Sequence, residues 1–256
     1  MSKYKLTDNT KILNNRTLYQ IQAIKDFGNI KSGELGGWIE KEVNLDQYDN
    51  CWVYGNAEVY GNAKVYDIAE VYGNAKVYGN ANVYGNSRVY GNSFVYGNAE
   101  VYGNAKVYDI AEVYGNAKVY GMAAVYGIAE VYGDSKVYGI AEVYGNAKVY
   151  GMAAVYGDAK VYGNAVVYGD AKVCGTIVGN ANVYNTIPYI NRSDGYLFTI
   201  FKEFDGSVKI TAGCRHFTLD EARDHWLKTR GGTPLGEETM IILECLEKIH
   251  KLYNKD

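Results

Sequence analysis

A valine recurs at every sixth position without interruption from Val53 to Val173. Each valine up to Val167 is followed by tyrosine, and from Val59 onward the residue two places before each valine is alanine or serine. A fixed period sustained over this length is typical of repeat architectures, in which one unit cannot bury its own apolar face and must stack on its neighbours. We therefore expect this range to form one continuous array of stacked repeats.

The order of residues within each repeat predicts which side chains face the core. In an extended segment, alternate side chains point to opposite faces. The valine and the small residue two places before it then share one face, and the tyrosine and the variable residue before each valine share the other. The variable position holds Glu58, Lys64 and Glu70, for example, so we expect it to face solvent.

The two remaining positions of each repeat predict a corner. The position after tyrosine is glycine except at Asp67 and Asp109, whereas the next position accepts β-branched residues such as Ile68 and Ile110. Glycine, and less readily Asp, adopts positive φ, which a β-branched residue does not tolerate. The glycine position is thus the predicted left-handed corner. A corner every six residues closes three sides in eighteen residues, giving an all-β, triangular solenoid of about seven coils.

An aliphatic residue at every sixth position, with a small residue two places before it, resembles the hexapeptide-repeat left-handed parallel β-helix family. The segment from Leu35 to Ala57 is similar to the lead-in segment of uncharacterised hexapeptide-repeat proteins from bacterial and bacteriophage genomes. The left hand of the helix is implied by this resemblance. The family includes acyltransferases, γ-type carbonic anhydrases and proteins without known activity, so the resemblance implies a fold more sharply than a function.

The repeat divides the chain into three parts: an N-terminal β cap and lead-in segment at 1–52, the hexapeptide-repeat β-helix at 53–184, and a C-terminal ββαα module at 185–256. Stacked coils leave open strand edges at both ends, and we expect the flanking segments to cover them. Trp38 and Trp52 are predicted to act as lid residues at the first end.

The C-terminal module is predicted from local signals. Asp205-Gly206 separates two alternating runs, which predicts a β-hairpin. Thr218 and Glu221 form a capping box for a first helix, and Pro234 begins a second helix with an apolar stripe that ends at Tyr253.

Composition and charge exclude several classes of function. The net charge is −3 and the pI is about 5.7, so we expect no nucleic-acid partner. No long apolar run predicts a membrane segment, and the cysteines at 51, 174, 214 and 245 lie too far apart for a CxxC motif. These features predict a cytoplasmic protein with free thiols, in the host cytoplasm if a phage encodes it.

Catalytic chemistry of the family cannot be assigned to residues of the repeat. The family's acyltransferases use a histidine base and a pocket-forming loop, and its carbonic anhydrases need histidine ligands on the coils. This chain has no histidine before His216 and no insertion between Val53 and Val173. We therefore predict no catalytic, cofactor-binding or metal-binding residues. Cys214 and His216 resemble a thiolate pair by spacing, but a strand end with ordinary packing is the favoured interpretation.

The predicted function is that of a non-catalytic scaffold or binding protein, encoded by a phage or prophage, which recognises a protein partner or self-associates through its terminal modules. The candidate partner-binding residues are Arg215, His216, Trp226 and Tyr253. One alternative is a hexapeptide-type acyltransferase with a site in the C-terminal module. Another is a protein that sequesters a small molecule, such as a signalling nucleotide, on its tyrosine ladders.

An internal duplication also favours function at the ends. The segment from Ala57 to Gly79 recurs from Ala99 to Gly121, a shift of 42 residues. That shift is a multiple of six but not of eighteen, so the copy lies on a different wall from the original. A partner that binds one wall would lose its contacts after such a duplication. A solenoid that only separates the two ends of the chain would become longer.

Overall fold

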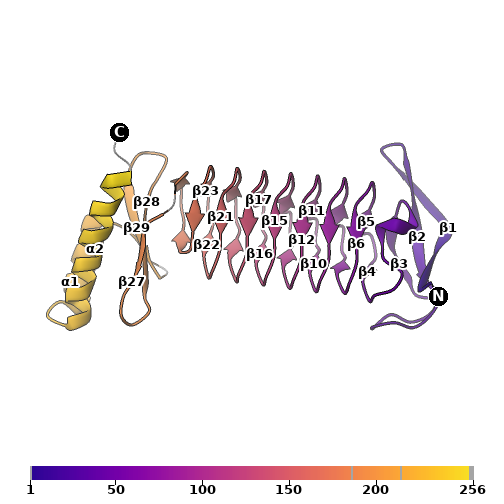
Figure 1. Ribbon diagram of the computed structural model, residues 1–256, viewed down its shortest axis with the longest axis horizontal. Helices are drawn as coiled ribbons and strands as arrows, with labels where there is room; N and C mark the ends of the chain where they lie inside the picture. The colour runs from indigo at the N-terminus through magenta and orange to yellow at the C-terminus, as the bar shows by residue number, and fades with distance from the viewer. Residues whose placement is uncertain (1, 186, 214, 254–256) are drawn as a thin grey trace.

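The computed structural model describes residues 2–185, 187–213 and 215–253. The repeat forms a straight parallel β-solenoid, with an antiparallel hairpin at its N-terminal end and a mixed module at its C-terminal end (Figure 1). Each repeat contributes one strand of two residues, and successive strands belong to three different walls. The predicted all-β triangular solenoid is confirmed.

The strands of each wall lie one coil apart. The first wall contains β3 (Leu35–Ile39), β5 (Glu58–Val59), β8 (Lys76–Val77), β11 (Phe94–Val95), β14 (Glu112–Val113), β17 (Glu130–Val131), β20 (Lys148–Val149), β23 (Val166–Val167) and β26 (Asn182–Val183). The second wall contains β6 (Lys64–Val65), β9 (Asn82–Val83), β12 (Glu100–Val101), β15 (Lys118–Val119), β18 (Lys136–Val137), β21 (Ala154–Val155) and β24 (Lys172–Val173). The third wall contains β4 (Trp52–Val53), β7 (Glu70–Val71), β10 (Arg88–Val89), β13 (Lys106–Val107), β16 (Ala124–Val125), β19 (Glu142–Val143), β22 (Lys160–Val161) and β25 (Thr176–Ile177).

The lead-in segment already forms part of the solenoid. Strand β3 pairs in parallel with β5, Leu45 forms a bridge with Val65, and β4 pairs with β7. The 3-10 helix η1 (Glu42–Asn44) lies between the first two of these contacts. The described chain therefore stacks about eight coils rather than seven, because one coil is built by residues that do not follow the hexapeptide pattern.

The core consists of the residues that the pattern assigned to it. Every repeat valine from Val53 to Val173 is fully buried, as are the alanines two places before them. Burial of one valine contributes roughly 1.5 to 3 kcal/mol, so the stacked valines supply the main driving force for the solenoid. Serine replaces alanine at Ser87 and Ser93, where each hydroxyl donates to backbone carbonyls and so avoids an unsatisfied buried group.

The corners have the backbone conformation that the sequence predicts. Gly115 has a φ of 71°, and a Cβ on it would lie 2.9 Å from the backbone nitrogen of Gly133 in the next coil. Asp67 and Asp109 adopt a φ of 59° at the same position. Each of these aspartates accepts a hydrogen bond from a backbone N–H one coil further on, which offsets the strain.

The tyrosines stack in three ladders along the rod. Tyr72 and Tyr90 have ring centroids 4.7 Å apart with an angle of 5° between their planes, and most other pairs are similar. The first pair of one ladder, Tyr54 and Tyr72, is T-shaped instead. The spacing equals that of neighbouring strands, so the ladders follow from the coil stacking itself.

The N-terminal cap closes one end of the core. Strands β1 (Tyr4–Leu13) and β2 (Arg16–Ala23) form an antiparallel hairpin, and β2 pairs with β3. Of the two predicted lid residues, Trp52 is fully buried and makes edge contacts with Tyr4 and Phe27, whereas Trp38 is only partly buried and lies under the ammonium of Lys11. The buried ammonium of Lys3 donates to the carbonyls of Asp49 and Cys51, which fixes the chain start against the first coil.

The last coil is two residues short, and the C-terminal module contacts it there. Cys174 stands where the second-wall ladder would have a tyrosine, and Gly175 leads directly into β25. A Cβ on Gly175 would collide with Oγ1 of Thr199, so glycine is required for this close approach. The hydroxyl of Thr211 donates to the carbonyl of Thr176, and Phe201 enters the solenoid core.

The C-terminal module is a sheet covered by two helices. The sheet has the order β27 (Tyr189–Asn191), β28 (Leu197–Lys202), β29 (Val208–Ala212) and β30 (Arg215–Thr218), so two further strands flank the predicted hairpin. Helices α1 (Leu219–Arg230) and α2 (Pro234–Tyr253) follow, and the capping box of Thr218 and Glu221 is confirmed. The sheet lies between the solenoid end and the helices (Figure 1).

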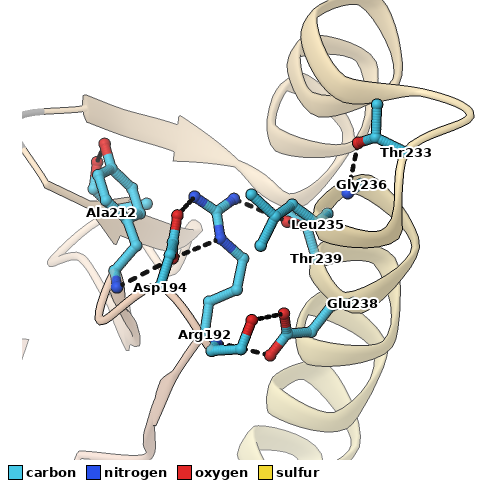
Figure 2. Close-up of polar contacts among 10 residues, drawn as sticks. Arg192, Asp194, Ala212, Thr233, Leu235, Gly236, Glu238 and Thr239 are labelled. Atoms are coloured by element: carbon cyan, nitrogen blue, oxygen red, sulfur yellow. Dashed lines mark hydrogen bonds and ion pairs between the residues drawn. The ribbon is translucent and has the colours of Figure 1, made fainter.

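Arg192 links the sheet to α2. Its guanidinium is buried, forms two hydrogen bonds with the carboxylate of Asp194, and donates to the hydroxyl of Thr239 (Figure 2). It also lies over the rings of Tyr196 and Trp226, at 5.0 Å from each centroid. This charge is paired, hydrogen-bonded and covered by aromatic rings, as a buried guanidinium requires.

Neither helix of the described chain has the length and apolar character of a membrane span.

Candidate functional site

The walls of the solenoid carry repeated and largely paired polar groups. The carboxylate of Glu58 lies 3.1 Å from the ammonium of Lys76, and that of Glu130 lies 2.8 Å from Lys148, as the register predicts. Tyrosine hydroxyls donate to glutamates of the next coil, as Tyr96 does to Glu112. Among the described residues no group of side chains could hold a metal ion. Exposed ion pairs of this kind contribute little to stability individually.

Corner asparagines add a second repeated network. The Nδ2 group of Asn62 donates to Oδ1 of Asn80, and that of Asn80 donates to Oδ1 of Asn98. Such ladders bind the coils to one another. Each such bond uses one of the two N–H donors of the donating amide.

Polar, charged and aromatic side chains come together where the C-terminal module contacts the last coil. A recess of about 390 Å³ opens there. Its lining includes Asn182, Tyr184, Phe201, Lys202, Glu203 and His250, and we call this set the junction recess. The volume falls within the range of small-molecule sites. Oδ1 of Asn182 is buried and has no hydrogen-bond partner within the described chain.

Glu203 connects the junction recess to His216. One carboxylate oxygen accepts from the backbone N–H of Asn180 and lies 3.8 Å from Nε2 of His216, while the other accepts from the hydroxyl of Ser207. At 3.8 Å the contact with His216 is electrostatic rather than a hydrogen bond. The ring of His216 stacks on Phe201, with an angle of 7° between the planes. Glu203 therefore fastens the last coil to the module and also faces a histidine.

Burial affects the charge of the histidines around this junction. Burial lowers the pKa of His216, and the nearby carboxylate of Glu203 offsets part of that shift. Burial, followed by the positive charge of Lys202, lowers the pKa of His250. Both imidazoles are therefore neutral at pH 7, the form in which a histidine accepts a proton.

The structure separates the four predicted partner-binding residues. Arg215 and His216 lie side by side on β30; Arg215 is exposed, and 29% of the His216 side chain is exposed. Trp226 is only 5% exposed and packs in the module core, so little of its ring is available to a partner. Tyr253 ends α2, and its side chain lies outside the described residues, as does Cys214 of the thiolate hypothesis.

The sequence pattern does not indicate a site at Asn182, Lys202, Glu203 or His250. Asn182 occupies an ordinary variable position of the repeat. For Lys202 and Glu203 the sequence predicts only the end of a strand before the turn. His250 reads as a favourable cation near a helix C-terminus. Only the docking of the module on the last coil brings these residues together, and no local pattern encodes that docking.

Two further recesses lie near the ends of the rod. One of about 460 Å³ is lined by Tyr144, Tyr162, Thr176 and Tyr196 at the C-terminal junction. Another of about 500 Å³ lies beside η1 at the N-terminal end. These three recesses lie at the two ends of the solenoid.

No protein-family model matches the chain. A stretch of 62 residues is 39% identical to a protein of Escherichia coli (strain K12) described as the uncharacterized acetyltransferase YdcK. The match covers 21% of this chain and 19% of that protein, so the chain matches less than a fifth of the relative's length. Together with the observed solenoid, this similarity fits a hexapeptide-repeat β-helix.

Proposed function

We propose that this chain is a non-catalytic scaffold in which the solenoid acts as a rigid spacer and the C-terminal module recognises a protein partner. The observation that supports this most directly is the contrast in surface chemistry. On the walls, carboxylates pair with a lysine or arginine one coil away at several positions, whereas exposed and recessed groups of different chemistry gather where the C-terminal module contacts the last coil.

Recognition by the module requires exposed groups on rigid elements, and β30 provides them. Arg215 is exposed on this strand, and no ion pair holds it within the described chain. Arginine is enriched where proteins bind one another, because its planar guanidinium pairs with carboxylates. As the lead-in resemblance implies, we also propose a phage or prophage gene as the source and the host cytoplasm as the location.

Capture from a bacterial lysate tests the spacer and recognition roles. Three versions of the full chain serve as bait: the unchanged protein, Arg215→Glu, and the matched charge reversal Lys136→Glu on the second wall. We expect the partner retained by the unchanged chain to be lost with Arg215→Glu and kept with Lys136→Glu. Loss with the wall variant alone would contradict the proposal.

The similarity to a named acetyltransferase supports acyl transfer as a second candidate function. In that case the neutral imidazole of His216, faced by Glu203, is the proposed general base. Release of free CoA from acetyl-CoA, measured with amine and hydroxyl acceptors, separates the two candidates. Turnover that His216→Gln abolishes would establish the enzyme and overturn the non-catalytic proposal.

A further inference from the structure

The junction recess lies between the end of a strand and the segment that leaves the last coil. Residues 200–206, at the end of β28 and in the turn after it, form one side, and residues 182–185 and 187–188 form the other. Two backbone hydrogen bonds join these sides. The N–H of Phe204 donates to the carbonyl of Asn180, and that of Ile200 donates to the carbonyl of Pro188. The recess is therefore part of the docked junction.

Two exposed aromatic side chains line the recess. Tyr184 is 47% exposed and Phe204 is 58% exposed. Tyr184 is the last ring of its ladder, and its plane is tilted by 39° from that of Tyr168, whereas Tyr114 and Tyr132 of the same ladder are tilted by only 3°. These two rings offer apolar surface to the body of a ligand, as is typical of small-molecule sites.

Charges of both signs line the same recess. Lys202 is exposed, and no ion pair holds its ammonium within the described chain. Glu203 and Asp205 supply carboxylates. One oxygen of Asp205 accepts from the N–H of Ser207, and the oxygens of Glu203 accept from Asn180 and Ser207. A carboxylate has about four acceptor sites, so both groups keep sites for further donors.

Asn182 adds an acceptor that lacks a donor. This residue lies on β26 at the edge of the recess, and its Oδ1 is buried without a hydrogen-bond partner within the described chain. A buried acceptor in this state is unfavourable, and a ligand that carries N–H donors would satisfy it.

We propose that the junction recess binds a free aromatic amino acid in its zwitterionic form. The ligand carboxylate pairs with Lys202, and the ligand ammonium donates to Glu203, Asp205 or Asn182. Its aromatic ring packs against Tyr184 and Phe204. A volume of about 390 Å³ holds one such molecule. This site is additional to the partner-binding role proposed for the exposed face of β30.

The mixture of charges favours a zwitterion over a simple ion. A ligand with only a carboxylate would be attracted by Lys202 but repelled by Glu203 and Asp205. A ligand with only an ammonium would be repelled by Lys202. A free amino acid carries both charges on one carbon atom, so each charge has a partner of opposite sign in the recess.

Isothermal titration calorimetry of the full chain tests the class of ligand. The probes are L-phenylalanine and L-tryptophan, with two analogues that each lack one charge. N-acetyl-L-phenylalanine has no ammonium and resembles the C-terminal residue of a peptide, and L-phenylalaninamide has no carboxylate and resembles an N-terminal residue. We expect a dissociation constant of about 1 mM or below for at least one free amino acid, and at least tenfold weaker binding of each analogue.

Three results of this titration would overturn the proposal. The first is no binding of either free amino acid up to about 10 mM. The second is equal binding of phenylalanine and both analogues, because the charges would then play no part. The third is tighter binding of one analogue, which would show a site for a simple ion or for a peptide end.

A substitution of Lys202 locates the site. Lys202→Met should weaken binding of the better amino acid at least tenfold but should not weaken binding of L-phenylalaninamide, which has no carboxylate to lose. Lys228→Met is the matched control, since Lys228 is an exposed lysine in the last turn of α1 that does not line the recess. Circular dichroism verifies that both variants are folded. Unchanged binding in Lys202→Met, or an equal loss in both variants, would place the ligand elsewhere and contradict the assignment.

Discussion

The solenoid and the C-terminal module bury their apolar side chains in different ways. The solenoid buries valines and alanines that are chemically identical from coil to coil, and each coil contacts only its neighbours. The module buries unlike groups once each, among them Arg192 and Trp226. A repeated core fixes the tyrosine and the corner of every repeat and leaves one outward position free to vary, whereas a core built once can present surface groups that occur once.

The difference also affects how each region responds to change. In a stacked array, stability is approximately a sum of unit and neighbour terms, so a coil can be lost without altering the geometry of the others. In the module, the contacts of one buried guanidinium connect the turn after β27 with both helices. We expect substitutions to separate the two regions in the following order of effect.

The largest effect is expected at a solenoid corner. Gly115→Val forces positive φ on a β-branched residue and places its Cβ against the backbone of the next coil. We therefore expect the free energy of unfolding to fall by at least about 3 kcal/mol. Asn116→Ile should cost less than about 1 kcal/mol, since Ile110 and Ile128 occupy equivalent positions. Chemical denaturation compares them. Gly115→Asp is the intermediate control, because Asp109 occupies an equivalent corner, and equal losses for all three would refute the corner assignment.

The second effect concerns the buried guanidinium of the module. Asp194→Ala leaves Arg192 without its carboxylate, and we expect a loss of stability that is confined to the module. Asp224→Ala removes an exposed carboxylate of α1 and should change stability by less than about 0.5 kcal/mol. Hydrogen exchange locates the change. Faster exchange spread through the solenoid coils would show that the two regions unfold together.

The third effect is a loss of module stability in acid. Burial lowers the pKa of His250 in the folded state, so the unfolded chain binds the proton first as the pH falls below about 6.5. Stability is therefore complete above that pH and declines below it. We measure the melting temperature of each variant at pH 7.5 and at pH 5.5. The decrease between the two pH values should be smaller in His250→Gln than in the control His225→Gln, because His225 is partly exposed. The reverse order would be incompatible with this assignment.

The smallest effect concerns the tyrosine ladders at high pH. Burial is the main cause that raises the pKa of Tyr54 and Tyr60 to about 12. The unfolded chain ionises near pH 10, so the ladders stabilise the fold below that pH and lose this contribution as the pH rises through the folded value. Absorbance at about 295 nm should show delayed ionisation of the folded chain relative to the chain in denaturant. Coincident titration curves would mean that the rings are solvated.

The solenoid could be predicted almost completely from the sequence. Its inward residues, its glycine corners and pairs such as Glu58 with Lys76 follow from a period of six and three sides per coil. The extra coil could not be predicted, because β3 and Leu45 pair with the repeat without sharing its pattern. Backbone pairing and the burial of Ile39, Leu45 and Trp52 together build that coil.

The junction was much less predictable. Turn and capping signals located the hairpin, Thr218 and Pro234, but nothing local indicates that Glu203 accepts a hydrogen bond from the backbone of Asn180. Trp226 illustrates the same limit, since an aromatic residue on a helix is equally compatible with a core or a surface. Contacts between a repeat and a non-repeated module depend on tertiary docking, which periodicity does not encode.

The most direct test of the spacer role is the removal of one whole coil, Val101 to Lys118, from the full chain. Coil stacking predicts a folded protein whose rod is shorter by about 4.8 Å, measured by small-angle scattering, with partner capture unchanged. Circular dichroism verifies the fold. A shortened chain that folds normally but no longer captures the partner, while Arg215→Glu still captures it, would place recognition on the walls and contradict this account.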